Sequence, residues 1–363
     1  MTCDAYYASK GIKKAVIPVL VRLLLTATAF IALLNAGCSA KWIMDVQPAP
    51  EPIQRPPAPS KERVRYSMMI SGFREVGMST GSLLFGKGGQ KLARPVAMAK
   101  GRDGRIAIAD TGCRCVHLYL PAEQQYHKIT TAEVELLSPV GVAFDDALRL
   151  YVADSLLAKV FVFDTRGDYL FSIKKTGDGV LKRPTGLAFD SKRKVLYVAD
   201  TLSQKVRAFD SKGSFLFSFG ERGTEEGRFN FPTHIFWSDA GNLYVTDSMN
   251  FRIQIFDPSG NFVSLFGSQG DGSGDFAIPK GVASGRERVI YVVDSLFDSV
   301  QLFDERGEFL LAVGGRGTGP GEFWLPSGIF LDDDNGMLYV CDTFNQRVQV
   351  FRISGRPAPV IQQ

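Results

Sequence analysis

The sequence predicts an all-β fold: a six-bladed β-propeller with four antiparallel strands in each blade and a ring closed by an N-terminal strand. Three observations lead to this prediction. A unit of 44–48 residues occurs six times, each unit contains four short strand signals, and the sixth unit ends after its third strand. Because one blade cannot bury both of its faces, neighbouring blades must supply the core and the ring must close.

Each unit is centred on a short apolar strand that ends in an acid followed by Ser or Thr. The repeated acids are Asp110, Asp154, Asp200, Asp247, Asp294 and Asp342. A Pro fifteen or sixteen residues before each acid begins the first strand, and a large apolar residue stands three residues before that Pro. The third strand alternates apolar and polar residues, as at 252–256, and a Phe-Asp-x-x-Gly turn usually leads to the fourth. Residues 65–70 form an orphan strand before the first unit, and we expect this strand to complete the last blade.

The first 38 residues are typical of an export signal. Basic residues precede an apolar run of 14 residues at 23–36, which is too short to span a bilayer comfortably. The segment 34–39, Leu-Asn-Ala-Gly-Cys-Ser, resembles the lipobox of bacterial lipoproteins, although Asn35 stands where an aliphatic residue is usual. The resemblance implies lipidation of Cys38 and, from Ser39, sorting to an outer membrane. Cleavage of a plain secretory signal and an uncleaved anchor are the alternatives.

The rest of the chain divides into a Pro-rich linker at 39–64, the propeller at 65–355 and a C-terminal tail at 356–363. Proline favours an extended, semi-rigid spacer between lipid and domain. Outside the signal the chain carries 38 basic and 37 acidic residues, a net charge of about +1, so charge gives no reason to expect a nucleic-acid partner. We therefore expect an exported protein that is held in the envelope by its N-terminal lipid and faces the periplasm or the cell surface.

The linkers and the segments after the acids resemble those of NHL-repeat propellers. Residues 317–329 and 270–282 carry the likeness in the linkers, and residues 342–348 and 247–253 carry it after the acid. The resemblance covers residues 65–353 and implies the same six-bladed fold. It does not single out an activity, because that family includes protein-binding modules, sensor ectodomains, RNA binders and a zinc-dependent amidating lyase.

The six acids are expected to be structural, because an Asp at a strand end can accept hydrogen bonds from the backbone of the following turn. A ring of acids that binds a cation at the channel mouth is the alternative. A three-His zinc centre like that of the amidating lyase lacks its ligands, since the chain has only His117, His127 and His234, and the first two fall on the third and outer strands of blade 1. No metal, cofactor or catalytic residue is predicted.

His234 is a candidate binding residue. It stands two residues after its repeat Pro, where the other units have Ala or Gly, and Trp237 follows closely. Small residues fit where the innermost strands crowd around the axis. His234 is therefore expected to project into the top of the channel and meet a ligand or water, unless it is a hydrogen-bonded residue that fills space.

A second candidate site is a set of apolar tips. Two residues after the acid, where NHL units often have Gly, five units carry a large apolar residue: Leu156, Leu202, Met249, Leu296 and Phe344. Loops after strands 2 and 4 open on one face of a propeller, so these tips would surround that face, close to Arg222, Arg228 and Lys280. Exposed, they would mark a protein or ligand site. The alternative is that each tip packs under the next linker.

Three cysteines lie within the predicted propeller. Cys113 and Cys115 belong to blade 1 and Cys341 to blade 6, and these blades are neighbours in a closed ring. We expect a disulfide from Cys341 to Cys113 or Cys115 to fasten the closing seam in an oxidising periplasm. A Cys-x-Cys pair alone is a weak signal for metal binding.

The sequence thus predicts a lipid-anchored, extracytoplasmic propeller that binds or scaffolds proteins of the cell envelope, rather than an enzyme. One alternative is a propeller enzyme of the lyase or lactonase type that acts at the channel mouth. Carboxylates and His clustered around a metal would favour this alternative. The other alternative is a sensor of carbohydrate, peptide or another small ligand. A polar, aromatic-lined pocket near Trp237 and Trp324 would favour it.

Overall fold

The computed structural model describes residues 40–50, 54–55, 64–77 and 88–353. Backbone contacts divide the chain into two units, residues 1–42 with 74–88 and residues 43–73 with 89–363. In the first unit, the backbone N–H of Glu75 donates to the carbonyl oxygen of Gly88 at 2.9 Å, and the N–H of Gly88 donates to the Glu75 carboxylate at 3.1 Å. The predicted signal with Cys38 and the predicted C-terminal tail lie outside the described residues. None of the helices among the described residues is long and apolar enough to cross a bilayer.

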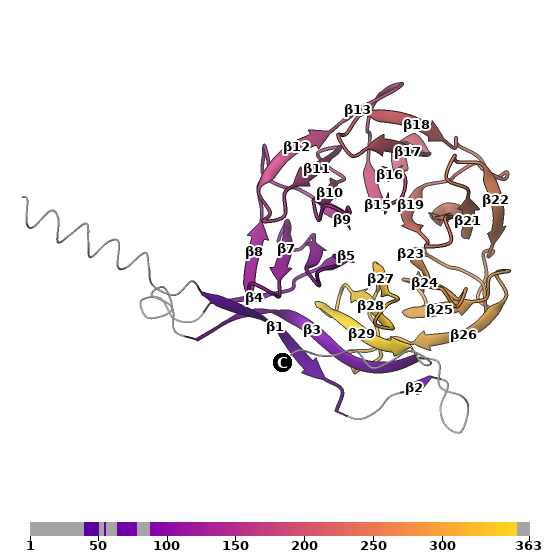
Figure 1. The fold of residues 1–363 in the computed structure, drawn as a ribbon. Helices are drawn as coiled ribbons and strands as arrows, with labels where there is room; N and C mark the ends of the chain where they lie inside the picture. Colours follow the sequence, from indigo (N-terminus) through magenta and orange to yellow (C-terminus); the bar gives the residue numbers. More distant parts are fainter. Residues whose placement is uncertain (1–39, 51–53, 56–63, 78–87, 354–363) are drawn as a thin grey trace, which may run out of the picture. The chain divides into compact units, whose positions relative to one another are not determined.

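The second unit confirms the prediction of a six-bladed propeller. Its antiparallel sheets stand in a ring (Figure 1). Residues of the inner strands line cavities along the axis of this ring, which we call the central channel. The first strands of the blades line that channel and are β5 (Pro95–Lys100), β9 (Pro139–Phe144), β15 (Pro184–Asp190), β19 (Pro232–Trp237), β23 (Pro279–Ser284) and β27 (Ile329–Asp332). The second strands end in the repeated acids and are β6 (Ile106–Asp110), β10 (Leu150–Asp154), β16 (Val195–Asp200), β20 (Leu243–Asp247), β24 (Ile290–Asp294) and β28 (Met337–Asp342).

The two outer positions of each blade complete the sheets. The third strands are β7 (Cys115–Leu120), β11 (Lys159–Phe163), β17 (Lys205–Asp210), β21 (Arg252–Phe256), β25 (Ser299–Phe303) and β29 (Arg347–Ile353). The fourth strands are β8 (Gln125–Ile129), β12 (Tyr169–Ile173), β18 (Phe215–Phe219), β22 (Phe262–Phe266), β26 (Phe309–Gly314) and, in the last blade, β3 (Val64–Val76). The connections between strands contain a small hairpin, β13 (Lys175–Thr176) with β14 (Gly179–Val180), and two single-turn 3-10 helices, η1 (Thr201–Ser203) and η2 (Ser248–Asn250).

The ring closes through β3, as the orphan strand predicts. β3 pairs antiparallel with β29, so that Val64 lies opposite Ile353 and Ile70 opposite Val348. It is longer than the predicted 65–70. Its sheet also holds three strands that the repeat does not contain, which are β1 (Lys41–Pro48), β2 (Gln54–Arg55) and β4 (Gly89–Lys91). Residues 41–48 of the expected spacer therefore form a strand against β3, because an unpaired strand edge offers free N–H and C=O groups.

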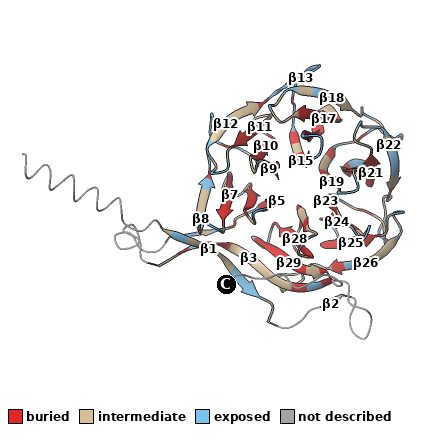
Figure 2. Ribbon diagram, in the orientation of Figure 1, coloured by how far each residue is buried: buried red, intermediate tan, exposed pale blue. Residues whose placement is uncertain are grey.

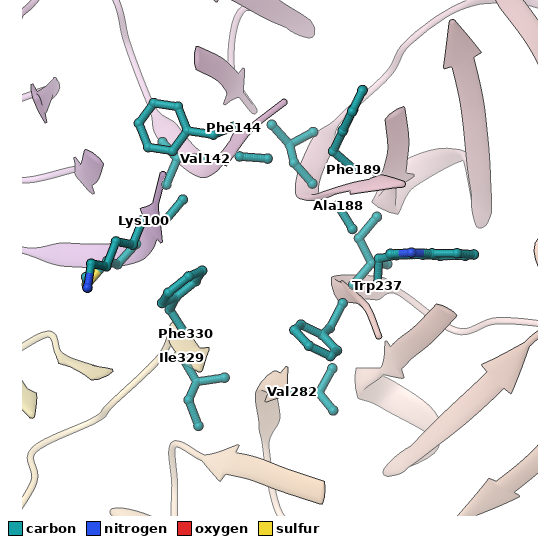
Figure 3. Close-up of a pocket in the computed structure, with 15 residues that line it drawn as sticks. Lys100, Val142, Phe144, Ala188, Phe189, Trp237, Val282, Ile329 and Phe330 are labelled. Atoms are coloured by element: carbon teal, nitrogen blue, oxygen red, sulfur yellow. The ribbon is translucent and has the colours of Figure 1, made fainter. Parts of the chain in front are cut away.

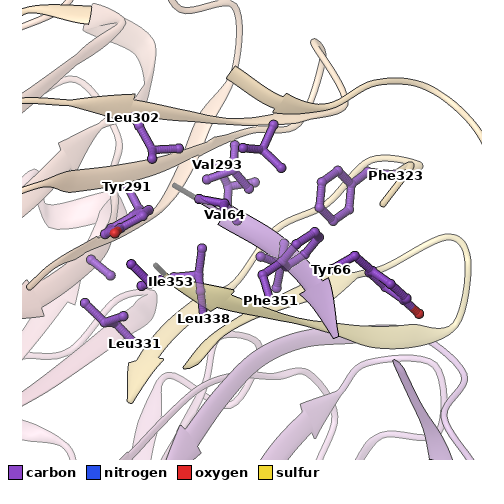
Figure 4. Packing of buried hydrophobic residues seen from close by; sticks show 14 residues of the cluster. Val64, Tyr66, Tyr291, Val293, Leu302, Phe323, Leu331, Leu338, Phe351 and Ile353 are labelled. Atoms are coloured by element: carbon purple, nitrogen blue, oxygen red, sulfur yellow. The ribbon is translucent and has the colours of Figure 1, made fainter. Parts of the chain in front are cut away.

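The core lies between adjacent blades. Buried residues concentrate in the inner three strands, whereas the outer strands are largely exposed or half-buried (Figure 2). The apolar residue three positions before each repeat Pro is at most 2% exposed; the set is Leu92, Leu136, Leu181, Phe229, Phe276 and Phe323. At the closing blade, Val64 and Tyr66 of β3 pack with Phe351 and Phe323 in one cluster with blade 5 (Figure 4). Each fully buried side chain of this size contributes roughly 1.5–3 kcal/mol, so burial of β3 helps to hold the ring shut.

Candidate functional site

Each repeated acid holds the linker before its blade and the turn after its strand. Asp154, fully buried, accepts backbone N–H groups from Leu137 (2.8 Å) and Ser138 (3.0 Å) in the linker and from Leu156 (3.1 Å) and Leu157 (3.0 Å) in the turn. All six acids are 0% exposed. A carboxylate that accepts several backbone donors at a strand end has a structural role, and these acids do not form an open ring at the channel mouth.

In blades 3 to 6 the hydroxyl residue after the acid joins one blade to the next, whereas Thr111 and Ser155 bond to Arg94 and Ser138 of their own linkers. Thr201 Oγ1 donates to the carbonyl oxygen of Pro232 at 2.7 Å, and Ser248 Oγ donates to that of Pro279 at 3.1 Å. Ser295 donates to Pro326 in the same way, and Thr343 donates to Pro95 at 2.8 Å across the seam. This role was missed from the sequence, although the invariable Ser or Thr after the acid was its signal.

Because one carboxylate fixes both the linker and the turn, their exposed side chains share a face. We call nine of them the apolar rim: Leu137, Leu156, Leu202, Phe231, Met249, Ile278, Leu296, Trp324 and Phe344. Their exposed fractions run from 37% for Phe231 to 69% for Leu156. The five predicted tips are thus in solvent instead of under the next linker, and four linker residues extend the set.

The cations predicted near this face differ in their surroundings. Arg222 and Arg228 are exposed, and Arg228 pairs with Glu221 (3.1 Å) and Glu225 (3.5 Å). Lys280 is half-buried, and burial together with the charge of Arg183 lowers its pKa. Arg228 is therefore paired with nearby carboxylates, whereas Lys280 lies on the inner strand β23 and its charge acts on His234.

His234 lines the narrow part of the central channel. The cavity there, of about 50 Å³, lies between glycines of neighbouring inner strands, such as Gly141, Gly186 and Gly281. His234 is half-buried, and its Nδ1 lies 3.3 Å from Thr233 Oγ1. Burial and the Lys280 charge lower its pKa to about 3, so the imidazole is neutral at physiological pH. It lies among the residues that line this cavity, as a neutral hydrogen-bonding group.

Trp237 lies at the other end of the same strand, beside a wider cavity of about 190 Å³. Phe144, Phe189 and Phe330 from other inner strands also line this cavity (Figure 3). Trp237 stacks on Tyr197 with ring centroids 5.5 Å apart. Trp324 belongs to the apolar rim instead, so the structure does not bring the two predicted tryptophans into one pocket.

Three stretches of the chain, 125–216, 224–296 and 285–358, match the family described as 6-bladed beta-propeller, and together they cover more than half of the sequence. This chain belongs to that family. No protein among the curated ones matches it.

Several solved structures share the fold of this propeller-family member. Virginiamycin B lyase from Staphylococcus aureus has a TM-score of 0.56 and 9% sequence identity, covering 86% of this chain and 100% of the lyase. Hydrazine synthase from Kuenenia stuttgartiensis has a TM-score of 0.52 and 14% identity, covering 73% and 97%. A protein of unknown function from Bacteroides thetaiotaomicron has a TM-score of 0.54 and 14% identity, covering 87% and 90%. Identities this low show the fold alone.

The cysteines of this propeller pair differently from the prediction. The expected disulfide between Cys341 and Cys113 or Cys115 is wrong, because the structure joins Cys113 to Cys115 and leaves Cys341 as a free, buried thiol. The turn after Asp110 brings the Cα atoms of Cys113 and Cys115 to 5.3 Å, within the span of a disulfide. Cys341 is packed inside the core on β28, where burial and the charges of Asp110 and Asp342 raise the pKa of its thiol.

His117 lies beside both cysteines, which sequence reasoning missed. Its Nε2 is 3.7 Å from the sulfur of Cys113 and 3.5 Å from that of Cys115, and its Nδ1 is 2.8 Å from the Tyr126 hydroxyl. Burial raises the pKa of the adjacent Asp110 carboxyl, but hydrogen bonds from His117 and from backbone N–H groups outweigh it and hold this pKa below its usual value. The signal was the spacing Cys-x-Cys-x-His, because alternate residues of a strand share a face.

Proposed function

We propose that this propeller is a lipid-anchored, extracytoplasmic module that binds a protein partner of the cell envelope through the apolar rim. One observation carries the proposal: nine of the fifteen large apolar side chains that are exposed among the described residues belong to this single face. Grouped apolar side chains on a monomer surface typically mark interaction sites. Aromatic residues, here Trp324 and Phe344 with ring centroids 5.7 Å apart, are typical anchors of such interfaces.

The rim can be tested with a matched pair of variants of the full chain. The rim variant carries Leu156→Ser, Leu202→Ser, Leu296→Ser and Phe344→Ser. The control variant changes four exposed apolar residues outside the rim to Ser, namely Leu170, Val180, Leu216 and Val263, with exposed fractions of 45–53%. Both variants should melt as the native protein does, because the altered side chains are in solvent.

Each protein is then used as tagged bait in detergent-solubilised envelopes. A partner that is recovered by the native chain and by the control variant, but lost from the rim variant, supports binding through the rim. Recovery of the same proteins by all three baits would reject it. The partner's own affinity for the native chain and for the two variants then gives the size of the effect, which we expect to be at least about tenfold for the rim variant.

The anchor is a separate part of the proposal. It rests on the lipobox-like segment 34–39 and on the apolar run of 14 residues that leads into it. Cys38→Ala should abolish incorporation of a labelled fatty acid and release the propeller from the membrane fraction. A membrane-bound Cys38→Ala chain without label would favour an uncleaved anchor, and an unlabelled native chain in the soluble fraction would favour plain secretion.

A second candidate function is the binding of a small apolar or aromatic ligand in the channel. The cavity of about 190 Å³, lined by Phe144, Phe189, Trp237 and Phe330, favours it. Catalysis has less support. The carboxylates nearest to this cavity line a second one of about 570 Å³ that shares Lys100 and Phe330 with it. Those carboxylates are held in ion pairs, Asp332 with Lys100, and Asp239, Asp333 and Asp334 with Arg286. Quenching of Trp237 fluorescence by a ligand, lost in Trp237→Phe, would identify the channel as a binding site.

A further inference from the structure

The repeat shows what normally surrounds a buried acid in this propeller. In blade 4, Asn250, Arg252 and Gln254 stand three, five and seven residues after Asp247 and donate to its Oδ2 at 2.8, 2.9 and 3.1 Å. Blade 6 repeats the arrangement around Asp342 with an Asn, an Arg and a Gln at the same three offsets. These offsets therefore place three side-chain donors on one carboxylate oxygen.

In blade 1 the same three offsets carry Cys113, Cys115 and His117. The two sulfurs and an imidazole nitrogen all lie within 4.8 Å of one another. His117 Nε2 is also 3.4 Å from Oδ2 of Asp110. A thiol is a weak hydrogen-bond donor compared with an amide or a guanidinium, so these cysteines are poor substitutes for Asn and Arg. Two sulfurs, an imidazole and a carboxylate are instead the ligand types of a thiophilic divalent cation.

The imidazole is oriented for this role. Nδ1 of His117 lies 2.8 Å from the Tyr126 hydroxyl, and the ring stacks near Phe73 with centroids 5.7 Å apart. In the metal-free site Nε2 carries the proton that it shares with Asp110. On metal binding this proton would leave, Nδ1–H would donate to the Tyr126 oxygen, and Nε2 would offer its lone pair to the cation, as metal-binding histidines do when their second nitrogen is held by a partner. Cys115 and His117 are buried, whereas Cys113 is half-buried and leaves an approach from solvent. The apolar rim is interrupted here, because Gly112 stands where the other five blades have an apolar tip.

We propose that Cys113, Cys115 and His117, with Asp110 beside them, bind a divalent cation of the zinc class when the two cysteines are reduced, and that the Cys113–Cys115 disulfide is the alternative state of the same site. Opening the disulfide takes two electrons and two protons from a dithiol reductant, which itself becomes a disulfide. The two thiols then release their protons to solvent as two sulfur–metal bonds form. Metal and disulfide exclude each other, because the same two sulfurs serve both. The proposal is independent of the apolar rim and its partner.

The test uses the full chain, reduced with excess dithiol, freed of reductant without oxygen and titrated with Co²⁺. We expect thiolate-to-cobalt charge-transfer absorption that saturates at one ion per chain and is displaced by Zn²⁺. The air-oxidised chain should show no such absorption until a dithiol is added. Bound Zn²⁺ should also slow re-formation of the disulfide, followed by alkylation and mass measurement.

Three variants decide the assignment. Cys113→Ser with Cys115→Ser should lose the absorption, while Cys341→Ser, which removes a thiol outside the site, should keep it. His117→Gln places in blade 1 the residue that blades 4, 5 and 6 have at this offset, Gln254, Gln301 and Gln349, so it should fold and bind cobalt at least about tenfold more weakly. Absence of the absorption in the folded, reduced native chain, or its survival in the double serine variant, would overturn the proposal.

Discussion

Thr343 Oγ1 donates a hydrogen bond of 2.8 Å to the carbonyl oxygen of Pro95, which joins the last blade to the first across 248 residues of sequence. The equivalent bonds from Thr201, Ser248 and Ser295 join neighbouring blades within the ring, where the two partners are close in sequence. At the seam it acts together with the β3–β29 pairing to keep the ring closed.

Loss of this hydroxyl should destabilise the closed ring. Thr343→Val keeps the shape of the side chain but leaves the carbonyl of Pro95 without its donor, and we expect a loss of about 1–2 kcal/mol in the free energy of unfolding. Denaturant titration measures it. Thr165→Val, in an exposed turn, is the control and should change stability little. Equal stability of the two variants would show that the seam does not depend on this bond.

Neutralising a repeated acid should be more damaging. Asp342 Oδ2 accepts hydrogen bonds from Asn345 (2.9 Å), Arg347 (2.8 Å) and Gln349 (2.9 Å). Asp342→Asn leaves a buried guanidinium without its counter-charge, which typically costs about 3–5 kcal/mol. Asp304→Asn, at an exposed turn where the carboxylate also accepts two backbone N–H groups, should cost only about 1 kcal/mol. Similar losses in both variants would contradict the ion-pair argument.

Stability should depend on pH through His234. Its pKa is lowered from 6.5 to about 3 in the folded protein, so between these values the unfolded chain binds a proton that the folded chain does not. Stability therefore falls as pH decreases from 6.5 toward 3, with a slope from this residue of at most ~1.4 kcal/mol per pH unit.

His234→Gln should remove this part of the pH dependence and leave the part that arises from carboxylates. Denaturant titrations of both proteins across the same pH range measure the difference between them. Above pH 6.5, where both states are neutral, the difference should be constant. Parallel curves over the whole range would show that His234 is protonated equally in the folded and unfolded chains.

A methyl group should not fit where the inner strands meet. A Cβ on Gly141 would lie 2.0 Å from the backbone carbonyl oxygen of Thr185, which cannot rotate away. Gly141→Ala should therefore lower stability by roughly 1–3 kcal/mol through overpacking. Gly89→Ala, where nothing lies within 4 Å of the new Cβ, is the control for the general effect of the substitution. A thermal melt of each variant checks the comparison.

The repeat was sufficient to predict the strands, the number of blades and the closing strand, because spacing and alternation are local properties. It did not predict β1. Residues 41–48 precede a Pro-rich stretch, and their strand forms only because β3, already in the ring, presents a free edge. Burial of the apolar tips could not be decided from sequence either, since it depends on the path of the neighbouring linkers.

The pairing of the cysteines could not be predicted from the sequence for a different reason. Adjacency of blades 1 and 6 made Cys341 a plausible partner, but pairing depends on the direction of the side chains, and Cys341 points into the core. Aligning the six units on their acids does place Cys113, Cys115 and His117 over the Asn, Arg and Gln of other blades. The alignment indicates a shared site only when the structure shows that the side chains at these three offsets lie around one carboxylate.

The closing strand also sets the order in which the molecule can be completed. β3 is synthesised before all six units, and its partner β29 is the last strand of the sixth unit. One edge of β3 therefore stays unpaired while nearly the entire chain is made. Contacts between such distant segments form slowly, and a strand edge left open in the meantime is where chains associate wrongly. β1 lies a short way upstream of β3 and can cover the other edge at once. Until β29 is synthesised, β3 thus has only one edge without a partner strand.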